Sequence, residues 1–157
     1  MKKLLILLLL IPTLTLAEEF ILVCEGVQTK AIDGKNKSTS DEQYIVEIND
    51  AHLLVSGAAY TKAQKIENKK GSDSESALDM RYEKTLSLIN ASADATIFYG
   101  TEKCDQKIIT KIKLTIDRTS SNINLSDTRE FSDDCKKKYR ITNTTFKGKC
   151  KKQERAF

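Results

Sequence analysis

The sequence is short of the residues that most often carry chemistry. Its 157 residues include no tryptophan, one histidine (His52) and four cysteines that never occur as Cys-x-x-Cys. Zinc sites usually pair their ligands at short spacing, so the cysteines are not expected to hold zinc. Because aromatic residues are few, a buried core has to rely on Ile, Leu and Val with the five Phe and five Tyr.

The single histidine also limits catalysis. It can join no multi-histidine metal site and at most one pair with a nucleophile. A general acid or base must lie within hydrogen-bond reach of its target, and no recognisable nucleophile accompanies His52. We therefore predict a protein that is not an enzyme and that uses no cofactor and no metal.

The first residues follow the pattern of a secretory signal peptide. Lys2 and Lys3 precede an unbroken apolar run over 4–11, and 15–17 (Thr-Leu-Ala) matches the small-x-small cleavage pattern. The run is well short of the roughly 20 apolar residues that a membrane-spanning helix needs. We expect 1–17 to be removed and 18–157 to form one domain.

The other end of the chain argues against an outer-membrane barrel. Such barrels often end in an aromatic residue, as this chain does, but Lys149, Lys151, Gln153 and Arg155 occupy the alternating positions before Phe157. Lys or Arg on a lipid-facing strand is destabilising by about 2–4 kcal/mol at the membrane midplane. The mature protein is expected to be periplasmic, soluble and not membrane-spanning.

Charge is divided unevenly along the chain. Residues 136–157 hold nine basic residues and one acid, a net charge of +8. Without Lys2 and Lys3 the chain has 24 basic and 22 acidic residues, a net charge of +2, so 18–135 carries about −6. Such asymmetry is typical of a tail with an anionic partner. It also fits a solvated strand face balanced by acids elsewhere in the fold.

Alternation of apolar and polar residues predicts β-strands along the mature chain. The clearest is 107–118, where Ile108, Thr110, Ile112, Leu114 and Ile116 share one face. Residues 28–43 have loop chemistry, 61–69 fits a strand or a short helix, and the Gly/Ser part of 61–79 is predicted to be an exposed loop. The remaining strands are predicted at 20–24, 43–49, 51–56, 80–89, 95–99 and 139–150, with a return strand from Ile123 and Leu125.

The expected fold is all-β, either an antiparallel β-barrel of calycin or lipocalin type or a sandwich, with about eight strands. Four cysteines in an exported domain predict two disulfides, for which three pairings exist. In an up-and-down barrel the first and last strands are neighbours. That arrangement would join Cys24 to Cys150 and leave Cys104 with Cys135.

Three segments carry a resemblance. They are Phe20-x-Leu22-x-Cys24-x-Gly26, then 114–119 (Leu-Thr-Ile-Asp-Arg-Thr), and Phe146-x-Gly148-x-Cys150-Lys151-Lys152 with Phe157 at the end. Together they resemble a group of small, uncharacterised exported bacterial proteins. The resemblance covers the mature chain in outline and implies a periplasmic β-rich domain without a particular activity. Ser121 stands where the group often has glycine, so this turn is expected to differ.

A second likeness lies in 56–60, which is Ser-Gly-Ala-Ala-Tyr. It is similar to the loop by which periplasmic inhibitors of C-type lysozyme enter the enzyme cleft, and it implies Ser56 and Tyr60 on a protruding loop. Ala59 replaces the arginine of that loop. Lysozyme is cationic, so the negative charge of 18–135 would favour such a complex and the basic tail would oppose it.

The basic tail supplies the densest charge feature. Its candidate binding residues are Lys136, Lys137, Lys138, Lys147, Lys149 and Lys151. Alternation places the last three on one strand face. That face suits the phosphate groups of an anionic envelope component, or a protein partner. Nucleic acid is not expected, because interleaved stacking aromatics are scarce.

These features support three functions, in this order. The first is a non-enzymatic periplasmic protein that binds at the cell envelope. The second is an inhibitor of a lysozyme-type hydrolase. The third is a carrier of a small hydrophobic ligand, because barrels of about eight strands can hold one. An open apolar interior would favour the carrier, whereas a filled interior would direct attention to the surface.

Overall fold

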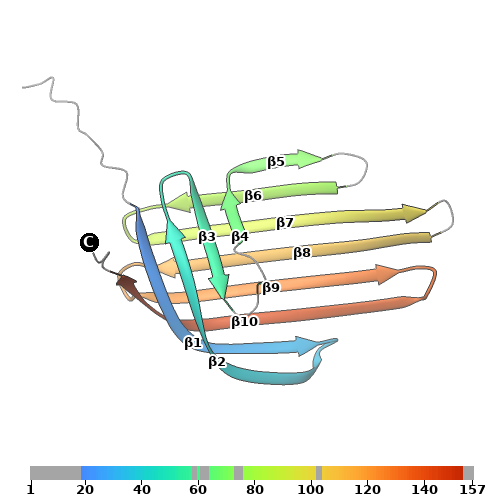
Figure 1. Cartoon of the computed structure of the whole chain (residues 1–157), viewed down its shortest axis with the longest axis horizontal. Coiled ribbons are helices and arrows are strands. Elements are labelled where there is room, and N and C mark those ends of the chain that lie inside the picture. The colour runs from blue at the N-terminus through green and yellow to red at the C-terminus, as the bar shows by residue number, and fades with distance from the viewer. Residues whose placement is uncertain (1–18, 58–59, 61–63, 73–75, 102–103, 154–157) are drawn as a thin grey trace, which may run out of the picture.

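The computed structural model describes residues 19–57, 60, 64–72, 76–101 and 104–153, and within these ranges all elements are β-strands (Figure 1). They are β1 (Phe20–Ile32), β2 (Lys35–Ile48), β3 (His52–Gly57), β4 (Gln64–Glu67), β5 (Lys69–Ser72), β6 (Ser76–Lys84), β7 (Leu88–Thr101), β8 (Cys104–Asp117), β9 (Asn122–Asp133) and β10 (Lys138–Gln153).

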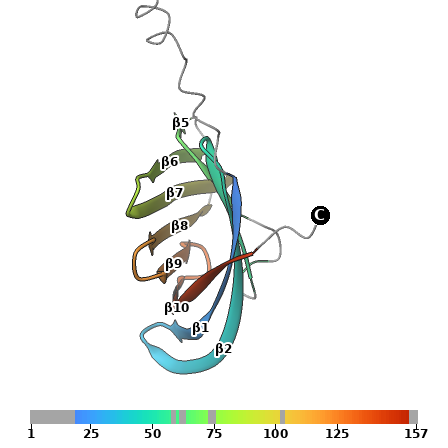
Figure 2. The same ribbon diagram turned by 90° about the vertical axis from the view of Figure 1, so that its left-hand side faces the viewer.

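The strands form one antiparallel sheet in the order β4-β3-β2-β1-β10-β9-β8-β7-β6-β5. β10 returns to pair with β1, and β4 lies against β6 and β7, so the sheet curls into a nearly closed barrel (Figure 2). The predicted all-β antiparallel barrel is confirmed. The expected count of about eight strands is wrong, because the described residues form ten.

The additional strands come from 61–79, a polar stretch whose Gly/Ser part was expected to be a loop. Only Asn68 separates β4, which pairs with β3, from β5, which pairs with β6. At this bend Asn68 Oδ1 accepts from Tyr82 N at 2.8 Å, and Asn68 Nδ2 donates to Tyr82 O at 3.1 Å. A side-chain amide offers the same donor and acceptor as the backbone. Asn68 therefore completes the ladder where the chain changes partner.

Residues 28–43 are also strand rather than the expected loop. They form the end of β1 and most of β2, and only Asp33 and Gly34 lie between the two strands. Both have positive φ, 51° and 69°, as a two-residue Asp-Gly hairpin turn requires. Asp33 Oδ1 accepts from Ile141 N at 2.7 Å, which ties this turn to β10. The composition misled the prediction because most of β2 before Tyr44 is exposed.

The predicted strand 80–89 contains a turn. β6 ends at Lys84, and β7 begins at Leu88. Leu86, which lies within the predicted strand, is 94% exposed in this turn. The Thr85 hydroxyl accepts from Leu88 N at 3.0 Å. A local side-chain hydrogen bond of this kind competes with continued strand pairing, and here it wins over the apolar pattern.

The core fills one half of the barrel. On β8 the predicted alternation is confirmed, with Ile112, Leu114 and Ile116 buried. Thr110 and Ile108, further along the same face, are only half-buried. Figure 1 shows that β3 and β4 cross the long strands β7 to β10 near one end only. The largest fully buried side chains are Tyr44, Phe146, Leu53, Ile66, Ile89, Leu114, Ile116 and Ile123.

The backbones of β1 and β10 approach each other very closely. Gly26 faces Gly148 across the two strands. A Cβ atom on Gly26 would lie 2.2 Å from the carbonyl oxygen of Lys147, and one on Gly148 would lie 2.3 Å from that of Glu25. No side chain fits at such distances, so this pairing requires glycine on both strands.

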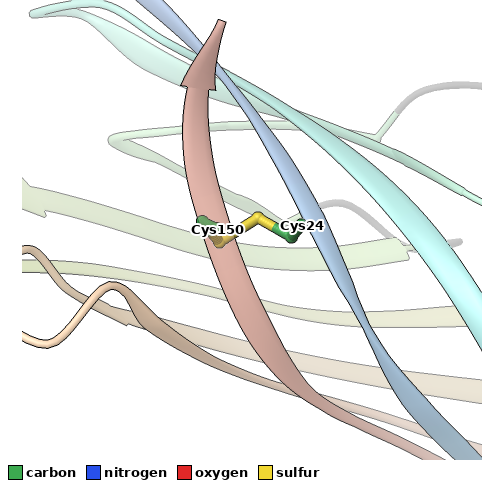
Figure 3. Close-up of a disulfide and its surroundings, with 2 residues drawn as sticks. All are labelled: Cys24 and Cys150. Carbon is green, nitrogen blue, oxygen red and sulfur yellow. A yellow bond between two sulfur atoms is a disulfide. The ribbon is translucent and has the colours of Figure 1, made fainter.

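The Cys24–Cys150 disulfide lies two residues from this glycine pair (Figure 3). Its two Cα atoms are 3.9 Å apart on directly opposed positions of β1 and β10, and the predicted pairing is confirmed. The second predicted pairing stays a prediction, because the Cys104 side chain lies outside the described residues. The backbone favours it, since Asp134 N donates to Asp105 O at 3.1 Å beside Cys135.

Replacing Gly148 with alanine should lower the free energy of unfolding by about 1–3 kcal/mol, because the methyl group would be forced against the β1 backbone. Gly71→Ala is the control, since a Cβ there meets nothing within 4 Å. The control should change stability by less than about 0.5 kcal/mol. Urea unfolding measures both, and equal stabilities would contradict the close approach.

Removing the disulfide with Cys24→Ala/Cys150→Ala should lower the free energy of unfolding by about 2–5 kcal/mol. The bond joins residues 126 positions apart, so it restricts much of the unfolded chain. Cys104 and Cys135 stay in place, which isolates this one bond. Urea unfolding without reductant tests the effect, and an unchanged midpoint with an unchanged slope would refute it.

Candidate functional site

The lysines at the end of β10 lie on the outer surface of the barrel. Lys147, Lys149 and Lys151 are exposed, whereas Phe146 and Cys150 on the same strand are buried. This is the period-two geometry of a strand, in which successive side chains point to opposite faces. The three lysines therefore share one exposed face.

Two lysines of β8 extend this face. Lys111 and Lys113 are exposed on the same side of the sheet, and β9 lies between β8 and β10. The β9 side chains between the two groups of lysines are neutral, with Asn124 and Ser126 in register with Lys147 and Lys113. Glu130 lies further along β9 on the same side, in register with Ile109. We call Lys111, Lys113, Lys147, Lys149 and Lys151 the basic face.

The positive charge of this surface is largely uncompensated. No ion pair joins a lysine of the basic face to an acid among the described residues. Two acids lie in register on the flanking strands, Glu25 opposite Lys149 and Asp94 opposite Lys111. Three of the five lysines thus have no acid directly opposite on a paired strand.

The other predicted lysines lie far from this face. Lys136 and Lys137 belong to the turn between β9 and β10, and Lys138 begins β10. Lys138 and Lys147 are nine positions apart in the sequence, about 30 Å at the rise of a strand. Lys136 N donates to Asp133 Oδ1 at 3.0 Å, so this group is part of a turn. The basic residues that lie close together in the sequence therefore lie at the two opposite ends of β10.

Ser56 and Tyr60 do not share an exposed surface. Tyr60 is buried with 9% exposure, and its ring meets that of Tyr44 edge-on at 6.2 Å. Ser56 Oγ donates to Ile45 O at 3.4 Å. Gly57 leaves room for the Tyr44 ring, which a Cβ would approach to 2.5 Å. Residues 58–59 lie outside the described part of the chain, so the predicted protruding loop is not tested there.

Tyr60 belongs to a buried polar cluster that sequence reasoning missed. Asp127 on β9 is 3% exposed, and Arg129, two residues on, donates to both of its carboxylate oxygens, at 2.8 and 3.2 Å. The Arg129 guanidinium carbon lies 5.9 Å from the centroid of the Tyr60 ring. Asp127 is therefore buried with a bidentate partner, whereas the side chain of Arg129 is 48% exposed.

The Tyr60 hydroxyl is buried, and it has no hydrogen-bond partner within the part of the chain that the structure describes. Burial raises the pKa of Tyr60 well above its usual range, the Asp127 carboxylate raises it further, and Arg129 opposes the rise. The pKa of Arg129 is raised in turn by its hydrogen bond to Asp127. Tyr60 is therefore a neutral donor at all ordinary pH values and is suited to hydrogen bonding rather than to nucleophilic chemistry.

The sequence carries a signal for this cluster. Ile123 and Leu125 begin the inward-facing row of β9, and the same alternation continues through Asp127, Arg129 and Phe131. Ionisable residues at core positions are uncommon in a strand and mark a site of interest. The sequence gives no such signal for Tyr60, because the residues around it do not alternate between apolar and polar.

Comparison with protein-family models, curated proteins and solved structures finds no match to this chain. Its function must therefore be inferred from the geometry of its own residues. Within the described ranges, no helix is long and apolar enough to cross a membrane. In the same ranges, no three side chains of His, Cys, Asp or Glu gather as a metal site would require.

Removing each of the two core tyrosine hydroxyls should change the free energy of unfolding differently. The Tyr44 hydroxyl donates to Gln28 Oε1 at 2.6 Å, so Tyr44→Phe should lower the free energy of unfolding by about 0.5–1.5 kcal/mol. The Tyr60 hydroxyl is unsatisfied, so Tyr60→Phe should leave stability unchanged or raise it by about 1 kcal/mol. Urea unfolding compares them. A loss in Tyr60→Phe as large as that in Tyr44→Phe would show that this hydroxyl is satisfied.

Proposed function

We propose that this protein is a non-enzymatic binding protein of the cell envelope, which docks through its basic face on a surface of anionic lipid phosphates. The observation that carries the proposal is the gathering of five exposed lysines from two strands on one side of the sheet. Neutral side chains of β9 separate the lysines of β8 from those of β10, and three of the five lysines have no acid directly opposite on a paired strand.

The strength of such a surface can be estimated. A basic residue close to an anionic membrane surface contributes about 1 kcal/mol, and clusters of about 4–8 are typical of protein segments that bind anionic lipids. The attraction fades within a Debye length, about 10 Å at 0.1 M salt. A face of five lysines meets these requirements better than a flexible tail, because all five charges lie on one sheet.

Apolar side chains beside the basic face support a lipid partner over a purely polar one. Val27 on β1 is 47% exposed and lies in register with Lys147. Ile45 on β2 is 39% exposed and also lies on the outer side of the barrel. Amphipathic surfaces of this kind combine electrostatic attraction with shallow burial of apolar groups at a membrane interface.

The Cys24–Cys150 disulfide supports an exported location, because disulfides persist in oxidising compartments. A periplasmic location remains part of the proposal. The alternative of a lysozyme-type inhibitor gains nothing from Tyr60, whose side chain is buried and is not offered to a partner. No catalytic role is proposed, since the high pKa of the Tyr60 hydroxyl leaves it protonated.

Binding to lipid vesicles tests the proposal. The mature protein should co-sediment with phosphatidylcholine vesicles that contain phosphatidylglycerol and not with phosphatidylcholine alone, and binding should weaken as salt is added. Lys147→Gln/Lys149→Gln/Lys151→Gln should weaken binding about 10- to 100-fold. Vesicles that carry lipopolysaccharide in place of phosphatidylglycerol then distinguish between the two phosphate-bearing lipids.

The matched control is Lys136→Gln/Lys137→Gln/Lys138→Gln, which removes the same charge from the opposite end of β10. It should weaken binding less than about threefold, since these residues lie more than a Debye length from the basic face. Equal losses in the two triple variants would mean that net charge alone drives binding. Absence of binding by the unmodified protein would refute the proposal outright.

A further inference from the structure

An open groove crosses β6, β7 and β8 on the outer side of the barrel. Its volume of about 460 Å³ lies within the range of small-molecule sites. Tyr82, Ala91 and Leu114 lie side by side along the groove, and their side chains are buried on the inner side of the sheet. Their backbone therefore forms the floor, and a ligand would meet the side chains of the residues before and after them.

One wall of the groove pairs two basic residues with a hydroxyl group. Arg81, Ser92 and Lys113 are in register on β6, β7 and β8. The side chain of Arg81 is 77% exposed, and Lys113 is exposed. The spacing of strands puts the two basic residues about 10 Å apart with the serine between them. Arginine binds phosphate through two parallel N–H donors and lysine binds it as a point charge, so this wall suits a phosphate group.

The acids nearest this wall lie in the next row of the sheet. Asp79 accepts from Arg81 Nε at 3.4 Å and from Arg81 Nη2 at 3.3 Å, and Asp94 lies in register with both Asp79 and Lys111. Exposed ion pairs are weak, because water screens them. Arg81 can therefore exchange Asp79 for a phosphate, and Asp79 competes with the ligand.

The other wall carries hydrogen-bonding groups of both kinds. Glu83, Asn90 and Thr115 are in register, about 7 Å along the strands from the first wall. Thr115 Oγ1 donates to Asn90 Oδ1 at 3.2 Å. This bond uses the amide oxygen of Asn90, so the amide nitrogen keeps its two donors, and the Glu83 carboxylate is an acceptor. Donors beside acceptors suit hydroxyl groups, whereas the carboxylate disfavours a second phosphate here.

We propose that this groove binds a phosphorylated polyol, with its phosphate on the wall of Arg81, Ser92 and Lys113 and its hydroxyl groups on the wall of Glu83, Asn90 and Thr115. Lys113 also belongs to the basic face. The inference therefore deepens the proposed function, and it rests on that function for the source of the ligand. The head group that docks is a glycerol phosphate or a sugar phosphate.

NMR titration of the mature protein with soluble head groups tests the groove without vesicles. The probes sn-glycerol 3-phosphate and glucose 1-phosphate should each bind about tenfold more tightly than inorganic phosphate or glycerol, because only they reach both walls. Tighter binding of the first probe assigns a glycerophospholipid, and tighter binding of the second assigns a glycolipid. No binding of either probe, or binding no tighter than that of inorganic phosphate, overturns the proposal.

Two substitutions at one ion pair test the phosphate wall. Arg81→Gln should weaken the binding of sn-glycerol 3-phosphate about tenfold, through loss of a charged hydrogen-bond donor. Asp79→Asn breaks the same ion pair but keeps the arginine and removes a competing charge. Binding should then be unchanged or tighter. Equal losses in the two variants would show that only the ion pair matters, and the assignment of Arg81 would fall.

Two asparagines on either side of Thr115 test the hydroxyl wall. Asn90→Ala should weaken binding about three- to tenfold through loss of one hydrogen bond. Asn124→Ala is the matched control, since Asn124 is in register with Thr115 on β9 and lies outside the groove. The control should change affinity less than twofold, and equal losses would overturn the choice of this groove.

The soluble probes and the vesicles separate this inference from the proposed function. Vesicle binding by a protein that ignores both soluble probes would overturn the groove and leave the basic face in place. Binding of a soluble probe by a protein that ignores anionic vesicles would support the groove and refute the proposed function.

Discussion

The pairing of β1 with β10 is the contact on which the rest of the structure depends. Without it the ten strands of the described residues would divide into two sheets, β1 to β4 and β5 to β10, with two more unpaired edges. Exposed edges invite association with other chains. Gly26 and Gly148 allow the two backbones to approach, and Cys24–Cys150 joins the same strands covalently. Because β1 is then fixed beside β10, β2, β3 and β4 cross the long strands and cover one half of their inner face.

The same pairing also determines which residues face inward. Side chains alternate between the two faces of a strand, so a shift of one residue would exchange them. With Cys24 opposite Cys150, Phe146 is buried and Lys147, Lys149 and Lys151 are exposed. The barrel that buries the core therefore presents the basic face on its outside. Toward the other end of the sheet, its inside carries Ile97, Ile108 and Phe131 in one row with Arg140, next to the polar cluster of Tyr60, Asp127 and Arg129.

Sequence patterns predicted the regular parts of this fold and missed the parts that depend on tertiary contacts. Alternation along β8 and the neighbouring ends of a closed barrel were enough to predict a buried Leu114 and the Cys24–Cys150 bond. The change of strand partner at Asn68 could not be predicted, because it depends on hydrogen bonds between the Asn68 amide and the backbone of Tyr82, 14 residues away. Tyr60 was expected on a protruding loop, and its burial depends on the Tyr44 ring of a distant strand. Local composition does not record such contacts.

The central claim is that the pairing of β1 with β10 presents the basic face on the outside of the barrel as a surface for anionic lipid. Methyl NMR of the mature protein, with labelled Ile, Leu and Val, tests it most directly as bicelles that contain phosphatidylglycerol are added. The account predicts that the methyl signals of Val27 and Ile45 on the outer side shift most, while those of the buried Leu114 and Ile116 stay in place. Shifts confined to Ile97 and Ile108 on the inner side, or spread equally over both faces, would contradict it.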